Sequence, residues 1–398
     1  MPLWELQEWL DEQDRPREVL WYIKRLSGND TLANGTHQAG PYIPKHILFN
    51  VLPSLERGSE TNPRETFEMA VDSHHDTQRV TAIWYNNKSR NETRITGHGG
   101  ADSALLDPDS TAALTVFAFW RETDVQPFRC HVWIARDAVE EDVIEERVGP
   151  VESGQTRVYP DLFSSLQQRP KCWLDEDELP LSWIEAYPTG GELVDKAIQL
   201  RPEASADVDH RLVVRRECEF EIYKSLEHVV EMPRIREGFG SVDEFLEVAQ
   251  PISQRRRSRG GRSLELQVKA IFEEENLVEG VDFSFQPVVD SNRRPDFVFP
   301  SESAYHDMAF PSDRLRMLAV KSTMRERWRQ VLEEAVRIDT KHLLTLQGAV
   351  SPNQFKAIQE AGIELVIPER LQSGYRTDIQ PYLRTLESFL GDVRALRP

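Results

Sequence analysis

The chain has 398 residues, of which 39% are hydrophobic, and this is enough apolar material for two or three domains with cores of their own. Asp and Glu number 67 against 48 Lys and Arg, so the net charge of −19 is opposite in sign to that of most DNA-binding proteins. No apolar run is long enough to span a membrane, and acidic residues stand near the N-terminus where a signal peptide carries bases. Composition thus excludes a membrane protein and predicts a cytoplasmic one.

The first part of the chain is predicted to be rich in β-strands. Residues 2–13 have apolar side chains at helical spacing, which predicts a short amphipathic helix. A second helix is predicted over 44–55. Short β-like segments separated by turn residues occupy 18–27, 66–74, 78–87, 91–97, 112–120 and 128–136. Strands this closely spaced predict a barrel or sandwich, so residues 1–172 are expected to form one β-rich domain.

The character of the sequence changes after this domain. Residues 173–205 contain Pro, Gly and many acids, which predicts a linker, and residues 206–398 are expected to form a second domain. Its predicted helices are 212–232, 241–252 and 263–276. Alternating elements then follow: strands 282–289, 296–300 and 317–322, helix 325–338, strand 342–347, helix 352–361 and strand 363–368. This order predicts a mixed α/β sheet flanked by helices, as in restriction endonucleases.

The three cysteines, Cys130, Cys172 and Cys218, lie far apart and have no metal-binding spacing. We expect no disulfide framework among them, in line with a reducing compartment.

A Pro-Asp pair and a lysine suggest the chemistry of the second domain. Asp296 opens one predicted strand and Lys321 ends the next, so antiparallel pairing would bring the two together. Each residue alone is explained equally well as an ordinary turn or strand-end residue. Together, in this order of elements, they favour a nuclease in which Mg²⁺ held by carboxylates and a lysine act on a phosphodiester.

The acid that such nucleases carry two residues before the lysine is missing, because Ala319 stands there. Glu334 follows Val331 by three residues at the edge of the apolar stripe of helix 325–338, so that helix could deliver its carboxylate instead. Asp296 and Glu334 are therefore the predicted metal ligands. Glu333 is the nearest rival, Glu265 on the preceding helix is a further candidate, and a solvated helix glutamate is the competing interpretation.

Charged clusters suggest contacts with DNA. Next to the predicted site, arginine side chains can pair with guanine edges and a carboxylate with cytosine, although a charged first helical turn looks the same. This cluster comprises Arg325, Glu326 and Arg327. The stretch 254–262, which ends at Arg262, holds five arginines and no acid.

The first domain has a basic segment of its own, 79–94. Strand alternation there puts Glu92 and Arg94 on one face, where they could read adjacent base pairs. From the sequence alone, a cross-strand ion pair on a solvated barrel face is the simpler explanation of the pattern. The loop 29–40, with His37 and Gln38, could line the same groove.

Several long stretches resemble the EcoRII family of restriction endonucleases. They include "YIKRLSGNDTLANGTHQAGPYIP", "LLDPDSTAALTVFAF", "SRGGRSLEL" and "RPDFVFPSESAYHDMAFPSDRLRMLAVKSTMRERWRQVLEEA". The resemblance implies a B3-like β-pseudobarrel that binds effector DNA, followed by an endonuclease-like catalytic domain. It also implies a prokaryotic homodimer that cuts double-stranded CCWGG with Mg²⁺, is activated by a second DNA copy, and works beside a methyltransferase of the same specificity.

The resemblance also implies roles for particular residues. Asp296, Lys321 and Glu334 match the catalytic set, and Tyr305 and Arg327 match positions near the scissile phosphate or the bases. The DNA-reading segment of the first domain matches "KSRNETR", which holds Lys88, Arg90, Asn91, Glu92 and Arg94. Thr93 stands where the family has a base, and the loop after it is less basic, so weaker effector binding is expected.

Two functions remain open on these grounds. The first is a site-specific endonuclease inhibited by its own first domain, with the acidic stretch in 173–205 meeting the arginines of 254–262 as a latch. The second is a DNA-binding regulator with a dead nuclease fold, for which Ala319 is the evidence. A sugar-binding β-domain protein is a weaker third, because it leaves the Asp296–Lys321 pair unexplained.

Overall fold

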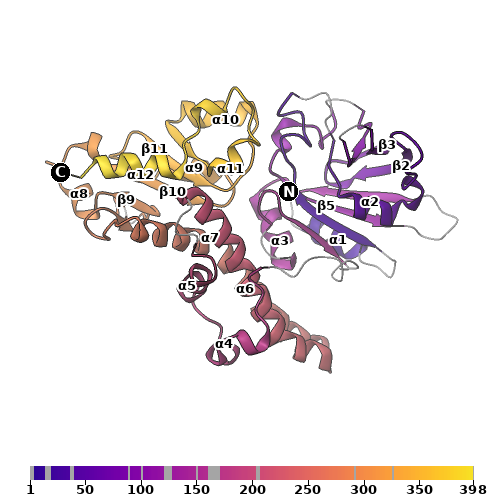
Figure 1. The fold of residues 1–398 in the computed structure, drawn as a ribbon, viewed down its shortest axis with the longest axis horizontal. Coiled ribbons are helices and arrows are strands. Elements are labelled where there is room, and N and C mark those ends of the chain that lie inside the picture. The colour runs from indigo at the N-terminus through magenta and orange to yellow at the C-terminus, as the bar shows by residue number, and fades with distance from the viewer. Residues whose placement is uncertain are drawn as a thin grey trace. The chain divides into compact units, whose positions relative to one another are not determined.

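The computed structural model (Figure 1) describes residues 4–13, 19–35, 40–87, 90–99, 102–120, 128–148, 151–159, 171–202, 207–290, 293–324 and 327–397. Two compact units emerge. The first comprises Met1–Ser165, Gln347–Ala357 and Ser373–Pro381, and the second comprises Leu166–Leu346, Ile358–Gln372 and Tyr382–Pro398. Within the described residues, no helix is both long and apolar enough to cross a membrane.

The first unit is built on a seven-stranded sheet in the order β4-β3-β2-β6-β5-β1-β7. Neighbouring strands are antiparallel except β2 and β6, which are parallel. All six predicted strands are confirmed. The strands are β1 (Leu20–Arg25), β2 (Arg64–Val71), β3 (Asp76–Tyr85), β4 (Glu92–Thr96), β5 (Leu114–Trp120), β6 (Arg129–Ile134) and β7 (Thr156–Tyr159), the last of which was not predicted.

Strand β5, an interior strand of the sheet, is buried on both faces, which explains its continuous apolar sequence. Phe117 and Phe119 belong to one apolar cluster, while Val116 and Ala118, which alternate with them, belong to another. Helix α1 (Trp4–Gln13) packs its buried Leu6, Trp9 and Leu10 into the second cluster, and α2 (Lys45–Val51) packs into the first.

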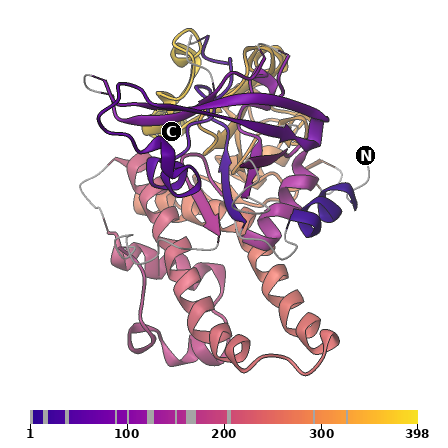
Figure 2. The ribbon, with the colours of Figure 1, turned by 90° about the vertical axis from the view of Figure 1, so that its right-hand side faces the viewer.

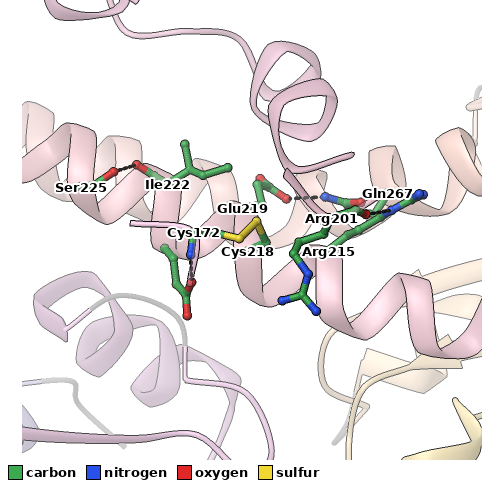
Figure 3. The surroundings of a disulfide bond; sticks show 9 residues. Cys172, Arg201, Arg215, Cys218, Glu219, Ile222, Ser225 and Gln267 are labelled. Atoms are coloured by element: carbon green, nitrogen blue, oxygen red, sulfur yellow. Dashed lines mark hydrogen bonds between the residues drawn. A yellow bond between two sulfur atoms is a disulfide. The ribbon is translucent and has the colours of Figure 1, made fainter. Parts of the chain in front are cut away.

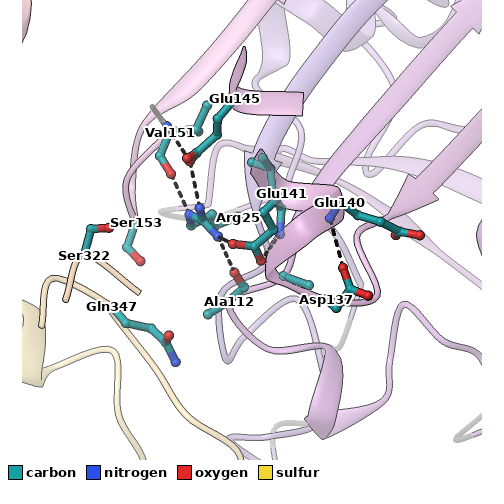
Figure 4. Close-up of polar contacts among 12 residues, drawn as sticks. Arg25, Ala112, Asp137, Glu140, Glu141, Glu145, Val151, Ser153, Ser322 and Gln347 are labelled. Atoms are coloured by element: carbon teal, nitrogen blue, oxygen red, sulfur yellow. Dashed lines mark hydrogen bonds and ion pairs between the residues drawn. The ribbon is translucent and has the colours of Figure 1, made fainter. Parts of the chain in front are cut away.

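A buried arginine fixes α3 (Ala138–Val148), a helix that the sequence did not reveal (Figure 4). Arg25 ends β1 and pairs with Glu141 and Glu145 of that helix, both at 2.8 Å. Its remaining N–H groups donate to the carbonyls of Val151 (2.6 Å) and Ala112 (3.0 Å). Because a buried charge is costly unless paired, this set of partners specifies where α3 docks on the sheet.

The second unit begins with helices where a linker was predicted. Within 173–205 lie α4 (Leu181–Glu185) and α5 (Gly190–Leu200). Two long helices, α6 (Val208–Glu237) and α7 (Val242–Glu274), replace the three that we expected, and Figure 2 shows them as a long hairpin. Helix α7 runs unbroken through the arginine-rich stretch 254–262.

The arginines of this stretch have partners within the hairpin. Arg255 pairs with Glu231 and Arg256 with Glu227, both at 2.5 Å. These contacts occupy two of the arginines that we had assigned to an interdomain latch.

A disulfide joins Cys172 to Cys218 of α6, so the expectation of no disulfide is wrong (Figure 3). The two cysteines are 46 residues apart in sequence, and spacing alone does not reveal that packing brings them together. They lie in an apolar cluster with Trp183, Leu193 and Ile222, so the segment after Cys172 packs as part of the helical region. Cys130 is buried without a disulfide.

The second sheet has the order β12-β11-β10-β9-β8. Strand β10 is antiparallel to β9, as predicted, and parallel to β11, which is parallel to β12. The strands are β8 (Ser284–Phe285), β9 (Phe297–Phe299), β10 (Arg316–Lys321), β11 (Lys341–Thr345) and β12 (Ile363–Val366), so the predicted strand 282–289 shrinks to two residues. Apolar residues of α7 and α12 share a core cluster with β9, β10 and β11.

The other helices of the C-terminal half are short. They are α8 (Glu302–His306), α9 (Trp328–Val331), α10 (Pro352–Glu360), α11 (Glu369–Gln372) and α12 (Leu386–Ala395). Six 3₁₀ turns complete the described elements: η1 (Pro53–Leu55), η2 (Asp72–His74), η3 (Pro108–Ser110), η4 (Glu176–Glu178), η6 (Ser312–Arg314) and η8 (Gln380–Tyr382).

Candidate active site and DNA-binding residues

The pairing of β9 with β10 brings Asp296 and Lys321 together. Phe297 is paired with Leu318, so Asp296, which precedes Phe297, lies beside the end of β10. One carboxylate oxygen of Asp296 accepts hydrogen bonds from the Val320 amide (2.7 Å) and from the Lys321 ammonium (2.9 Å). Both side chains are largely buried. Asp296 is therefore held by the backbone of Val320 and the side chain of Lys321 at the end of β10.

Glu334 reaches the same place from outside the sheet. Burial raises the pKa of its carboxyl to about 7, with Lys321 opposing this shift and Asp296 adding to it. Its Oε2 atom is buried and has no hydrogen-bond partner in the structure. A buried carboxylate oxygen without a donor is rare in proteins and is a mark of a site that binds something.

Glu265 of α7 completes the acidic centre. Its carboxylate accepts a hydrogen bond from the Gln286 amide at 2.7 Å. Burial, and next the charge of Asp296, raise the pKa of Glu265 to about 7. Three carboxyl groups thus interact with one ammonium group at a partly buried place.

Lys321 is the cation of this centre. Burial opposes its charge, but the neighbouring Asp296, and then Glu334 and Glu265, hold the pKa of Lys321 above its ordinary value. The lysine is therefore protonated at neutral pH and can donate to an anionic oxygen.

The route by which Glu334 arrives differs from the predicted one. The expected helix 325–338 is wrong for the described residues, because α9 ends at Val331 after one turn. Ala335 then adopts a left-handed conformation with a φ of 47°, which an α-helix does not contain. Glu334 lies in the turn between them. Its neighbour Glu333 is exposed and pairs with Arg293 at 3.0 Å, away from the acidic centre.

Tyr305 lies beside this turn rather than in the acidic centre. It is buried on α8, and its hydroxyl donates to the carboxylate of Asp290 and accepts from the Arg337 amide at 3.3 Å. The structure thus gives Tyr305 contacts to the segment that carries Glu334.

Arginines that we did not single out line the approach to the centre. Arg293, Arg294 and Arg329 line an open pocket of about 390 Å³, which Glu333 and Glu334 also border. The two arginines before the Pro-Asp pair were a visible signal in the sequence. Of the predicted DNA contacts, Arg327 is half-buried just before α9 and Arg262 is exposed on α7, while Arg325 and Glu326 lie outside the described residues.

In the candidate DNA-reading segment of the first unit, some polar side chains are already bonded to other groups of the protein. Glu92 and Arg94 point the same way and form an ion pair at 3.6 Å along one strand. The Arg94 guanidinium also donates to the carbonyls of Gly40 (2.9 Å) and Asn29 (3.3 Å), so it ties these two residues to β4. Lys88, His37 and Gln38 lie outside the described residues.

The exposed part of this segment gathers around Asn91. Its amide oxygen accepts from the Trp84 indole (3.0 Å) and from the ammonium of Lys45 (3.2 Å). The ammonium of Lys45 also lies 5.5 Å from the centre of the Trp84 ring, and the Arg90 guanidinium 5.8 Å from that of Tyr85. Lys45 is a cation at this face that the sequence analysis missed.

Comparisons with known proteins identify both halves of the chain. The family profile "EcoRII C terminal" matches residues 223–390, and "Restriction endonuclease EcoRII, N-terminal" matches residues 16–162. Among solved structures, metal-depleted Ecl18kI in complex with uncleaved, modified DNA is 17% identical, with a TM-score of 0.42 over 53% of this chain and 80% of that one. The UbaLAI restriction endonuclease B3 domain with cognate DNA is 20% identical, with a TM-score of 0.29 over 39% of this chain and 98% of that one.

The predicted architecture, a B3-like β-rich domain followed by an endonuclease-like α/β domain, is confirmed by the two family matches and the two sheets. The Type II restriction enzyme EcoRII of Escherichia coli is 40% identical over 391 residues, which are 94% of each chain. This protein therefore belongs to the EcoRII family of Type II restriction endonucleases.

Proposed function

We propose that this endonuclease hydrolyses DNA phosphodiesters with Mg²⁺ through Asp296, Glu334 and Lys321. The observation that carries the proposal is the acidic centre itself: three partly buried carboxyl groups around one protonated lysine, with one Glu334 oxygen left without a donor. Carboxyl groups whose pKa values are shifted by burial and by each other are typical of catalytic sites. The alternative, a DNA-binding regulator without activity, leaves this arrangement unexplained.

The residues present fit a divalent cation of the magnesium type. Within the described residues, no group of three or more His, Cys, Asp or Glu side chains could hold a metal ion by protein ligands alone. A magnesium ion does not require such a group. Mg²⁺ is usually held by one or two carboxylates, with water and substrate phosphate as the remaining ligands, so Asp296 and Glu334 suffice. When bound, it supplies positive charge to the phosphate and lowers the pKa of the attacking water.

The protein groups have separate tasks in this mechanism. The ammonium of Lys321, fixed by Asp296, donates to a phosphate oxygen where negative charge builds up in the transition state. Glu265 is near its pKa at neutral pH and can hold a proton beside Asp296. Arg293, Arg294 and Arg329 attract the DNA backbone to the pocket beside Glu334.

The DNA sequence that the enzyme cuts is proposed from its family. We propose that the second unit cuts double-stranded DNA at CCWGG, where Arg325, Glu326, Arg327 and Arg262 contact the bases or backbone. A cognate methyltransferase would protect the same sites in the prokaryotic cytoplasm. A homodimer is supported by the tip of the α6–α7 hairpin, where Ile235, Phe245 and Leu246 are exposed.

The first unit is proposed to bind a second copy of the DNA as effector and to inhibit cleavage until it does. Arg90, Asn91 and Lys45 form an exposed polar face for this contact. Arg94 and Glu92 would then contact bases, and Arg94 would also keep Asn29 and Gly40 beside β4. Two DNA-binding units in one chain are what such an arrangement requires.

A plasmid digest tests the central claim. Supercoiled plasmid with several CCWGG sites is incubated with the full chain in Mg²⁺ or in EDTA, and linear products are counted on a gel. We expect cutting only with Mg²⁺, and none by Lys321→Ala, which should still bind the duplex. Lys196→Ala, on α5, is the control and should cut normally. Persistent cutting by Lys321→Ala would refute the assignment, and no cutting by the wild type would favour the regulator.

A further inference from the structure

The segment that carries Glu334 is a turn that its own backbone hydrogen bonds hold only in part. In an α-helix the carbonyls of residues 334, 335 and 338 would accept from amides four residues later. The chain leaves helical geometry at Ala335, so this pattern stops, and the Ala335 carbonyl accepts instead from the Ile338 amide, three residues on, at 2.9 Å. A buried carbonyl without a donor is costly, and the turn therefore needs donors from elsewhere.

Lys341 supplies them. Its ammonium donates to the carbonyls of Glu334 (2.6 Å), Ala335 (3.2 Å) and Ile338 (3.2 Å). Lys341 is the first residue of β11 and is only 7% exposed. Its amide also donates to the Gly362 carbonyl at 3.1 Å, which anchors it to the start of β12. An ammonium has three N–H donors, and here all three have backbone acceptors.

The opposite side of the turn is held by an anion. The carboxylate of Asp290 accepts from the Val336 amide at 2.8 Å and from the Tyr305 hydroxyl. That hydroxyl in turn accepts from the Arg337 amide. The guanidinium of Arg337 donates to the carbonyls of Tyr305, Asp307 and Phe310, which ties the far end of the turn to α8. These contacts thus hold the backbone of residues 334–338, at Glu334 and directly after it.

We propose that Lys341 and Asp290 are positioning residues that fix the Glu334 carboxylate where it can bind the divalent cation. A carboxylate on β10 at position 319 would be placed by the sheet, whereas one on a turn has no such support. Lys341 restores the link, because β11 is paired in parallel with β10, the strand of Lys321. The inference rests on the proposed metal role of Glu334.

The alternative is that Lys341 only stabilises the fold. A structural role would lower the melting temperature and affect every variant equally. A positioning role acts through Glu334 and must vanish when Glu334 can no longer bind metal. A double-mutant cycle separates the two, provided that metal binding is measured apart from catalysis.

The readout is cleavage of the polypeptide by hydroxyl radicals from Fe²⁺ bound at the site, which cuts the chain beside the metal and needs no DNA. Full-length wild type, Glu334→Gln, Lys341→Met and the double variant are titrated with Fe²⁺, and Mg²⁺ is added as competitor. We expect Lys341→Met to raise the half-saturating Fe²⁺ concentration about tenfold or more, as loss of a group that orients a metal ligand does. Its effect should disappear in the Glu334→Gln background.

Leu343→Ala is the matched control, because it truncates a fully buried side chain of the same strand. It should lower the melting temperature without moving the Fe²⁺ half-saturation. If Lys341→Met does not fold, Asp290→Asn, which removes the charge and keeps the shape, enters the same cycle. Unchanged Fe²⁺ binding, or an effect that persists beside Glu334→Gln, overturns the positioning role. Unchanged binding in Glu334→Gln alone would instead overturn the metal role of Glu334.

Discussion

Glu334 is our candidate for the metal-binding carboxylate that position 319 does not supply. Position 319 on β10 is a buried alanine, whereas Glu334 lies in the turn after α9. What identifies Glu334 is its environment: it is buried near Asp296 and Lys321, and one of its oxygens has no donor. Its sequence neighbour Glu333 shares none of these features.

This contrast gives a direct prediction at the residue scale. Glu334→Gln should lower Mg²⁺-dependent cleavage about a hundredfold or more, because it removes charge where the reaction needs it. Glu333→Gln loses only an exposed ion pair with Arg293 and should change stability by less than about 1 kcal/mol, with normal cleavage. Single-turnover rates on a one-site duplex measure both. Equal losses in the two variants would contradict the assignment of Glu334.

The raised pKa of Glu334 predicts a pH-dependent cost in stability. Its folded-state pKa of about 7 lies above the ordinary value of 4.5, so between these values the folded protein binds more protons than the unfolded chain. Stability therefore falls as pH rises from about 4.5 to about 7. Glu334→Gln removes this loss and should be more stable than wild type at pH 8 by about 1–2 kcal/mol, after allowance for solvent screening.

Urea unfolding in EDTA at pH 5 and pH 8 tests this expectation. The two proteins should converge at pH 5 and separate at pH 8. A variant that is less stable than wild type at pH 8 would show that the carboxylate is not under electrostatic strain.

At the scale of elements, local patterns predicted the sheets better than the helices. The strands around Asp296 and Lys321 have short apolar runs that pair with near neighbours, so the sequence carries their signal. The prediction of a helix over 325–338 was wrong because the chain leaves helical geometry at Ala335, where the Lys341 ammonium donates to the backbone carbonyls. The periodicity of that segment does not reveal this contact. Tertiary contacts of this kind override local propensity.

The prediction for α7 was wrong in the opposite way, because the helix is longer than expected. The predicted helices 241–252 and 263–276 are parts of this one helix, which continues through Pro251 and the pair Gly260–Gly261. Ion pairs of Arg255 and Arg256 with glutamates of α6 offset part of the cost. Such pairing is invisible until the two helices are known to be neighbours.

The disulfide between Cys172 and Cys218 gives a prediction at this scale. It closes a loop of 46 residues, which in the chain-entropy account stabilises the folded state by about 3–4 kcal/mol. Replacing both cysteines by serine should lower the free energy of unfolding by about this amount. Adding a reductant should bring wild type to the same value and leave the double variant unchanged, as measured by urea unfolding.

Cys130→Ser is the control for thiol chemistry, because Cys130 forms no disulfide. It should leave the response to reductant intact. The bond does not form in solution if the reductant leaves the free energy of unfolding of the wild type unchanged and mass spectrometry finds two free thiols.

At the scale of the whole molecule, the net charge of −19 has to be reconciled with DNA binding. Binding depends on the local field, and the cations gather where DNA is expected: Arg293, Arg294 and Arg329 beside the acidic centre, and Lys45 and Arg90 on the first unit. Salt should weaken both contacts, so all rates must be compared at one ionic strength.

The last prediction concerns why one chain carries two DNA-binding units. If the first unit inhibits the second, effector DNA activates by binding better to the uninhibited state, as any allosteric ligand does. Residues 171–398 should then cut one-site DNA faster than the full chain, which should accelerate when a short CCWGG duplex is added. The fragment must begin before Cys172, because Cys172 and Trp183 pack against α6 and a start at 206 would strip that apolar face. A scrambled duplex is the control and should not activate. If the fragment is folded by circular dichroism but no faster, and the cognate duplex has no effect on the full chain, the first unit serves only to anchor the enzyme on DNA.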